Sequence, residues 1–76
     1  MISITKTEKT RLLNAEISFY LAITGYSKEQ LSLKIGISLA SYYNKMKDID
    51  TFTYRELVNL FKVLKLDDET RLKLLS

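Results

Sequence analysis

The side chains of this sequence that could do chemistry are hydrogen-bonding and cationic groups rather than nucleophiles or metal ligands. The chain contains no histidine and no cysteine, which removes the usual general base near neutral pH and the commonest ligands of zinc. Ser27 and Thr53 each precede a helical pattern and are better explained as helix caps than as nucleophiles. Asp48 and Asp50 are two nearby carboxylates, which without histidine are a weak signal for metal binding or acid–base catalysis. The sequence therefore argues against an enzyme, and we expect no cofactor, metal or small-molecule ligand.

A different chemistry is available over residues 38–47, where the sequence reads SLASYYNKMK. Serine and asparagine donate and accept hydrogen bonds, and Lys45 and Lys47 add positive charge with no acidic residue in the same segment. An asparagine amide can form two hydrogen bonds with adenine, and alanine or leucine can contact the methyl group of thymine. This combination of groups could contact the edges of nucleotide bases.

The net charge of +3 is modest, but it is unevenly distributed. Residues 1–36 carry five basic and three acidic side chains, residues 37–47 carry two basic and no acidic ones, and residues 48–76 carry five basic and six acidic ones. The positive excess therefore lies in the part of the chain up to Lys47. An anionic partner would approach that part.

Start signals and apolar spacing predict an all-α protein with five helices. The chain has two glycines and no proline, and 46% of its residues are hydrophobic, so little interrupts a helix and a compact core can form. The first helix is expected over about residues 6–24, followed by Gly25. Its apolar face is expected to consist of Leu13, Ile17, Tyr20, Leu21 and Ile23.

Four further helices are predicted from capping patterns. Ser27 with Gln30 forms a capping-box pattern at the start of the second, and Ser38 is expected to cap a third over residues 39–47. Residues 47–53 are interpreted as a polar loop. A second capping-box pattern, Thr53 with Glu56, predicts a fourth helix whose apolar stripe is Leu57, Leu60, Phe61 and Leu64. Asp67 is expected to cap a fifth helix.

The second and third predicted helices meet at Gly36, and this bend has the features of a DNA-binding helix-turn-helix. Leu31 and Ile35 give the helix before Gly36 an inward face, and Tyr42 and Met46 give the helix after Gly36 a narrow inward face. The remaining face of the helix after Gly36 carries small, amide-bearing and aromatic side chains, whereas a plain surface helix prefers Glu, Lys, Gln and Arg. A helix that buries one narrow face and leaves the rest free is suited to the major groove.

The stretch S-x-E-x-L-x-x-x-I-G-I-S from Ser27 to Ser38, together with SYYNKMK, resembles the XRE-like helix-turn-helix domains of phage repressors and Cro proteins. It is similar to small regulators of Gram-positive phages and mobile elements, and the resemblance covers roughly residues 17–68. It implies one compact, five-helix, lambda-repressor-like domain over residues 1–76 with the helix-turn-helix at about 27–47. It further implies a recognition helix in the major groove and usually a dimer on DNA.

Geometry and this resemblance together assign roles to particular residues. The candidate base contacts are Leu39, Ala40, Ser41, Tyr43 and Asn44. The candidate phosphate contacts are Lys28, Lys34, Ser38, Lys45 and Lys47. Because arginine, the commonest reader of guanine, is absent from the recognition helix, we expect an A/T-rich operator. The expected function is that of a repressor or Cro-like transcriptional regulator.

Other interpretations of the same residues remain open. Tyr43 could instead pack on a neighbouring helix, and Lys28 and Lys34 could be ordinary solvated lysines. A phage-encoded protein-interaction module, acting as an inhibitor or adaptor on the same helical scaffold, would use Leu39, Tyr43 and Leu75 as anchors.

Two expectations concern assembly and location. Three leucines near the C-terminus cannot all be buried on one side of a short helix, so a homodimer contact is expected there, at Leu72, Leu74 and Leu75. The first residues, MISITKTEKTRLLN, are polar and charged where a signal peptide needs an apolar stretch, and no apolar run approaches the roughly 20 residues of a membrane helix. We therefore expect a cytoplasmic protein of a bacterial or phage-infected cell, with double-stranded DNA as its partner.

Overall fold

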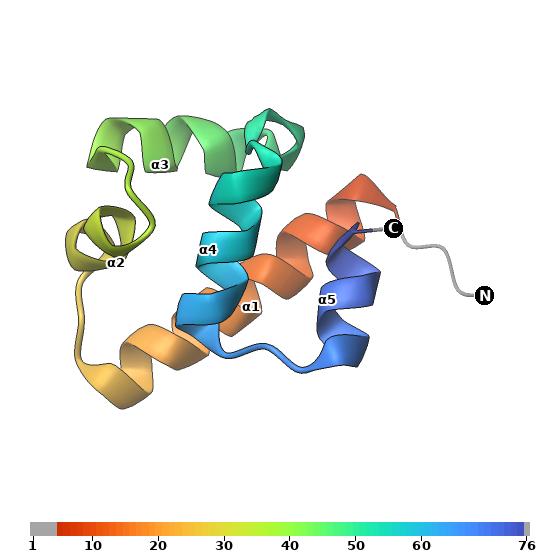
Figure 1. Ribbon diagram of the computed structural model, residues 1–76, viewed down its shortest axis with the longest axis horizontal. Helices are drawn as coiled ribbons and strands as arrows, with labels where there is room; N and C mark the ends of the chain where they lie inside the picture. The colour runs from red at the N-terminus through yellow and green to blue at the C-terminus, as the bar shows by residue number, and fades with distance from the viewer. Residues whose placement is uncertain (1–4, 76) are drawn as a thin grey trace.

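Five α-helices begin and end close to the predicted positions in the computed structural model, which describes residues 5–75 (Figure 1). They are α1 (Lys6–Thr24), α2 (Lys28–Lys34), α3 (Leu39–Lys47), α4 (Tyr54–Leu64) and α5 (Asp68–Leu75), with a short 3-10 helix, η1 (Ile49–Thr51), between α3 and α4. No strand occurs among the described residues, so the predicted all-α class is confirmed. The start of the polar N-terminal stretch, residues 1–4, lies outside the described part of the chain. No helix within residues 5–75 is both long and apolar enough to cross a membrane.

Side chains satisfy the free N–H groups at the helix starts, which explains why the boundaries can be read from the sequence. Reciprocal capping boxes occur at three starts, with the pairs Thr5–Glu8, Ser27–Gln30 and Thr53–Glu56. Ser38 caps α3 by accepting the N–H of Ser41, and the Asp67 carboxylate accepts the N–H of Thr70 before α5. The four starts predicted from capping residues are confirmed, and the Thr5–Glu8 box is an additional one.

The core forms where α1 packs against α4 and α5, and where α2 packs against α3 and α4. Leu31 and Leu60 are completely buried, and Leu13 and Ile17 nearly so. The other buried apolar side chains are Ile35, Tyr42, Ile49, Phe52, Phe61, Leu64, Leu66 and Leu74. The apolar stripes predicted for α1, α2 and α4 thus meet in one continuous cluster, with Leu57 at its margin.

The segment predicted to be a polar loop between α3 and α4 contributes to the core instead. Ile49, the first residue of η1, and Phe52, which follows η1, are both buried. The Asp48 carboxylate caps this turn by accepting the N–H of Asp50. The prediction failed because two apolar residues three apart fall on the same side of a 3-10 turn. Two apolar residues in so short a segment are too few to predict an α-helix or a strand.

Two apolar residues face the other way from the prediction. Ile23 is 65% exposed, because six residues after Ile17 the α-helix has turned it about 120° away from the buried side. Leu74, a predicted dimer contact, lies in the protein's own core, while Leu72 is 69% exposed. Leu74 is therefore not free to meet a second copy, and of the three predicted leucines only Leu72 and Leu75 are on the surface.

The turn between α2 and α3 is closed by backbone hydrogen bonds around Gly36. The N–H of Gly36 donates to the carbonyl of Leu33 at 3.1 Å, and the N–H of Ile37 donates to that of Ser32 at 3.0 Å. These two bonds form the Schellman motif, which requires a left-handed residue directly after the residue that caps the helix. Gly36 supplies that residue with φ of +82°.

Replacing Gly36 by alanine should therefore lower the free energy of unfolding by about 1 kcal/mol, the cost of a left-handed non-glycine residue. No atom lies within 4 Å of the position that a Cβ would take, so the loss should come from the backbone alone. Urea unfolding of Gly36→Ala and Gly36→Asn measures it, with Asn expected to lose less because it tolerates this conformation. An alanine variant as stable as the wild type would contradict the prediction.

Candidate nucleic-acid interface

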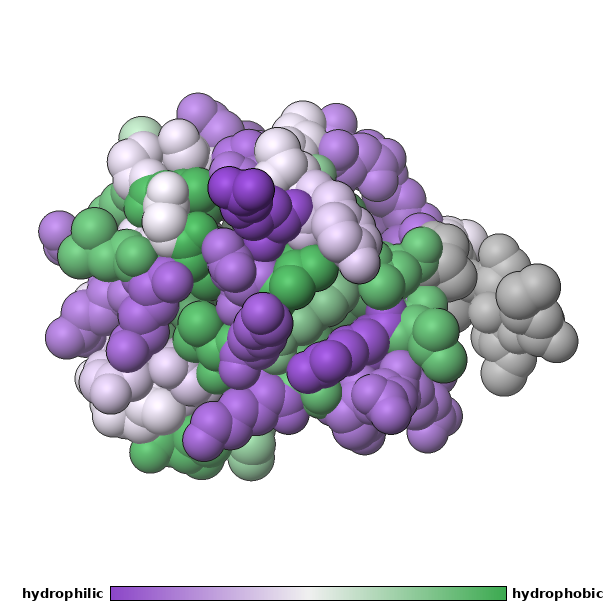
Figure 2. Space-filling model, in the orientation of Figure 1, coloured by the Kyte–Doolittle hydropathy of each residue, from purple (hydrophilic) through white to green (hydrophobic). Residues whose placement is uncertain are grey.

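α3 lies along one edge of the molecule and is covered on one side only (Figure 1). It contacts α2 and η1. Hydrophilic and intermediate side chains predominate over this edge in Figure 2. A helix in this position has a free side that could enter a groove.

The two sides of α3 differ sharply in burial. Tyr42 is 2% exposed, and burial raises the pKa of its phenol, with the neighbouring Tyr43 adding to the effect. Four residues on the opposite side are exposed, and we call them the outer stripe: Ala40, Tyr43, Asn44 and Lys47. Their spacing of three, four and seven residues places them on one face of the helix. Three of the five predicted base contacts are therefore together on the surface.

Leu39 and Ser41, the other two predicted base contacts, lie at the margins of the outer stripe. Leu39 is partly buried and packs against the core. The hydroxyl of Ser41 accepts a hydrogen bond of 3.1 Å from the hydroxyl of Ser38. Ser38 itself is exposed, but its oxygen also accepts the N–H of Ser41. These side chains are thus partly engaged within the protein.

An open groove of about 460 Å³ runs beside the outer stripe where α1, α2 and α3 converge. Its lining includes Lys28 from α2 and Lys47 from α3, and the ammonium of Lys28 lies 5.7 Å from the centre of the Tyr43 ring. Asn14 of α1 also lines it. No pattern in the sequence pointed to Asn14, because only packing brings α1 beside the end of α3. Two predicted phosphate contacts therefore border one groove.

Lys45 is held against the protein surface by three groups. Its ammonium lies 2.9 Å from the Glu56 carboxylate, donates to the carbonyl of Thr51 at 3.1 Å and sits 5.8 Å from the centre of the Phe52 ring. Only 20% of its side chain is exposed. This lysine joins the end of α3 to the start of α4, which is a positioning role rather than that of a free surface cation.

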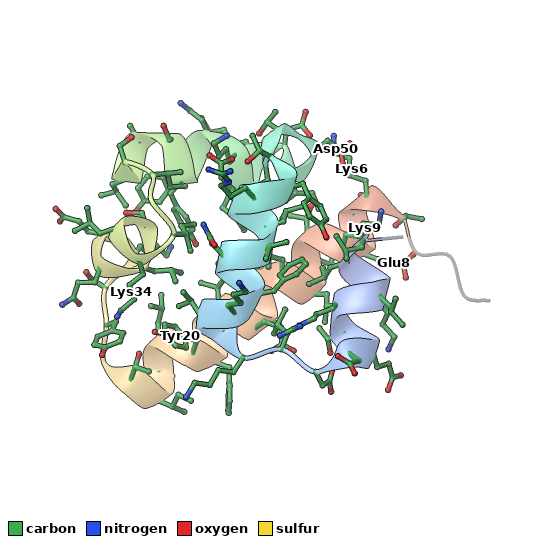
Figure 3. The ribbon with its side chains drawn as sticks, viewed as in Figure 1. Lys6, Glu8, Lys9, Tyr20, Lys34 and Asp50 are labelled. Atoms are coloured by element: carbon green, nitrogen blue, oxygen red, sulfur yellow. The ribbon has the colours of Figure 1, made fainter. Side chains whose placement is uncertain are left out.

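Lys34 lies apart from the outer stripe. Figure 3 shows it beside the connection between α1 and α2, and its ammonium is 4.9 Å from the centre of the Tyr26 ring. Such a contact between a cation and an aromatic ring is favourable by itself. Of the four predicted phosphate-binding lysines, Lys28 and Lys47 are thus the two beside the exposed face of α3.

The two carboxylates that follow α3 are paired with the first residue of α1 (Figure 3). The ammonium of Lys6 lies 2.6 Å from Asp48 and 3.5 Å from Asp50. Its hydrogen bond lowers the pKa of Asp48, helped by the backbone N–H of Asp50, while Asp48 raises the pKa of Lys6. No group of His, Cys, Asp and Glu side chains within residues 5–75 could hold a metal ion. Asp48 and Asp50 therefore serve to connect α1 with the end of α3.

The anchors required by a protein-interaction module do not share one surface. Tyr43 lines the groove beside α3, whereas Leu75 lines grooves beside α4 that have no residue in common with it. Leu39 is partly buried against the core. Leu75 is therefore separate from the exposed face of α3, and Leu39 lies only at its margin.

No protein family, curated protein or solved structure matches this chain. The candidate interface therefore rests on its own geometry.

The contribution of the Lys45–Glu56 ion pair to stability can be tested by changing the pH. The backbone N–H of Thr53 and then the Lys45 ammonium lower the pKa of Glu56 from its ordinary value of 4.5. A lowered carboxyl pKa contributes stability that is present above the unfolded value and is lost as the pH falls through the folded value. Glu56→Gln keeps a side chain that can complete the capping box, as Gln30 does, but removes the charge.

We therefore expect Glu56→Gln to lower the free energy of unfolding by about 0.5–1 kcal/mol at pH 7 and to weaken its decline below pH 4.5. Urea unfolding between neutral and acidic pH measures both. Glu16→Gln makes the same charge change at a carboxylate of α1 that forms no ion pair with any described residue, and this variant should behave like the wild type. Equal pH profiles for wild type and Glu56→Gln would disprove the proposed role of the pair.

Proposed function

We propose that this protein is a sequence-specific DNA-binding transcriptional regulator in which α2 and α3 form a helix-turn-helix and α3 enters the major groove. The observation that carries the proposal is the outer stripe, a continuous exposed face on a helix whose other side is held by the core. Such a rigid, one-sided helix is what major-groove recognition requires. The Schellman turn at Gly36 and the packing of α2 on α3 and α4 support it.

The chemistry of the outer stripe favours A/T-rich DNA. The amide of Asn44 can pair with the N6 and N7 edge of adenine, and the methyl of Ala40 can contact a thymine methyl. Tyr43 borders the same face, with Leu39 and Ser41 at its margins. No arginine occurs in α3 to form the bidentate contact with guanine.

Phosphate binding falls to the cations that border the groove beside α3. Lys28 and Lys47 come from different helices and could contact the backbone on one side of the recognition helix. Contacts of this kind fix the register of a protein on the duplex and carry little sequence information. Lys34 is left out because it does not line this groove, and Lys45 because Glu56 engages it.

A helix as short as α3 reaches only a few base pairs, so we expect two copies on a two-fold symmetric operator. The regulator would act in the cytoplasm of a bacterial or phage-infected cell, as a repressor or a Cro-like antagonist.

Selection from random duplexes followed by an electrophoretic mobility shift tests the proposal. The wild-type chain should enrich an A/T-rich sequence and should bind it less tightly as salt increases. Failure to prefer any duplex at low salt would refute the proposal.

Asn44→Ala should weaken binding to the selected duplex by about 1–3 kcal/mol, roughly 5- to 150-fold in Kd, because the adenine contact is lost. Binding to unrelated DNA should change little, since phosphate contacts remain. Titration of both duplexes measures the ratio. An equal loss on both would contradict a base-reading role for Asn44.

Lys47→Gln should instead weaken binding to all duplexes similarly and reduce the slope of log K against log salt by about 1. Lys65→Gln is the matched control, because Lys65 is an exposed lysine at the end of α4 and does not line the groove beside α3. A slope that changes as much for Lys65→Gln as for Lys47→Gln would contradict the assignment.

A further inference from the structure

A groove of about 190 Å³ lies where α1, η1, α4 and α5 meet, and it shares no residue with the groove beside α3. Most of its lining is apolar, and part of that lining belongs to the core, since Leu13, Phe52, Phe61 and Leu74 are buried. The expectation of no small-molecule ligand rests on single segments of the sequence, whereas this groove is made by the packing of four elements.

The size and the lining of this groove suit a small apolar group. A dry apolar cavity of about 150 Å³ can hold benzene, so a groove of about 190 Å³ has room for a chain of about six carbon atoms. Leu75 is 47% exposed and also lines the groove, which is therefore open to solvent on the side of α5. A ligand that enters would remove its own apolar surface and that of Leu75 from water.

Lys9 of α1 places a positive charge beside this apolar lining. Figure 3 shows it in the first turns of α1, close to α5, and it is one of two charged residues that line the groove. Its side chain is partly buried, and its ammonium forms no ion pair and no ring contact with any residue between 5 and 75.

The carboxylates around Lys9 are engaged by other groups. Glu8 accepts hydrogen bonds from the backbone N–H and the hydroxyl of Thr5. Asp50, the other charged residue in the lining, lies 3.5 Å from the ammonium of Lys6. Within the described chain the charge of Lys9 therefore lacks a counterion, and the groove is complementary to an apolar ligand with one negative charge.

We propose that this groove binds a small aliphatic monocarboxylate, with its chain among Leu13, Phe61 and Leu74 and its carboxylate on the ammonium of Lys9. Burial of the chain supplies most of the affinity. The charge-assisted hydrogen bond to Lys9 supplies the selectivity. An amine of the same length would bring a like charge to Lys9, and an alcohol would leave its charge without a counterion.

Titration of the isotope-labelled wild-type chain with hexanoate, hexanol and hexylamine, followed in amide NMR spectra at neutral pH and constant ionic strength, tests this inference. Hexanoate should bind with a Kd of about 1–10 mM, the range for a ligand of about eight non-hydrogen atoms. It should shift the resonances of Leu13, Phe52 and Leu74 rather than those of Ala40 and Asn44. Hexanol should bind several-fold more weakly than hexanoate, and hexylamine more weakly still.

Three results would each overturn the inference. They are the absence of saturable shifts with hexanoate, shifts that centre on another part of the chain, and binding of hexanol or hexylamine as tight as that of hexanoate. Since no DNA is present, none of these results bears on the proposed function, and a chain that binds hexanoate but no duplex would refute only the latter.

Variants of Lys9 test its role in selectivity. Lys9→Gln should weaken hexanoate binding about three- to tenfold and leave hexanol binding unchanged, because only the contact with the charge is lost. Lys9→Arg keeps the charge and should retain the preference for hexanoate over hexanol. Lys65→Gln is the matched control, because Lys65 is exposed and does not line this groove, and it should bind hexanoate like the wild type.

Equal hexanoate affinity for Lys9→Gln and the wild type, or equal losses for Lys9→Gln and Lys65→Gln, would also overturn the inference. Unchanged hexanol binding shows that the groove of Lys9→Gln is intact. If that variant fails to fold, the ranking of the three ligands on the wild-type chain remains decisive.

Discussion

Burial of Tyr42 beneath α3 is the contact on which the arrangement of the candidate interface depends. α3 is a nine-residue helix at the edge of the molecule, and an isolated helix of that length is not stable in water. It persists because Tyr42 enters the core formed by α1, α2 and α4, with Leu39 and Met46 packed at the margin. The same burial leaves the opposite face, with Ala40 and Asn44, open to solvent.

Polar contacts then fix both ends of α3. At its start, Ser38 caps the helix directly after the Schellman turn at Gly36. At its end, Lys45 is tied to Glu56 of α4, and the following Asp48 is tied to Lys6 of α1. Exposed ion pairs add little to overall stability. Their value here is orientation, because under the proposed function α3 must be held at a defined angle to its scaffold.

The proposed DNA-binding surface is confined to one helix. The outer stripe belongs to α3, whose other side is held by the core. Under the proposed function a surface this small would need a second recognition helix on the other half-site of an operator. The modest charge of +3 agrees with this, since affinity would come from two copies rather than from one strongly basic surface.

The sequence by itself determined the helices and most of the core. Capping residues such as Ser27, Thr53 and Asp67 act on backbone groups within one turn, so their effect is local and readable. Apolar spacing likewise predicted the buried stripe of α4, because a helix repeats every 3.6 residues wherever it is placed. The exposure of Ala40, Tyr43, Asn44 and Lys47 also agrees with the expectation that one side of this helix remains free.

Only the tertiary structure decided which partners the side chains find across the fold. Lys45 looks like a free cation in the sequence, and Glu56 captures it from the next helix. Asn14 joins the groove beside α3 although it is distant in the chain, and Leu74 rather than Leu72 turns into the core. These outcomes depend on how helices cross and how far each rotates about its axis. Packing of the whole chain sets those angles, and local sequence rules do not contain them.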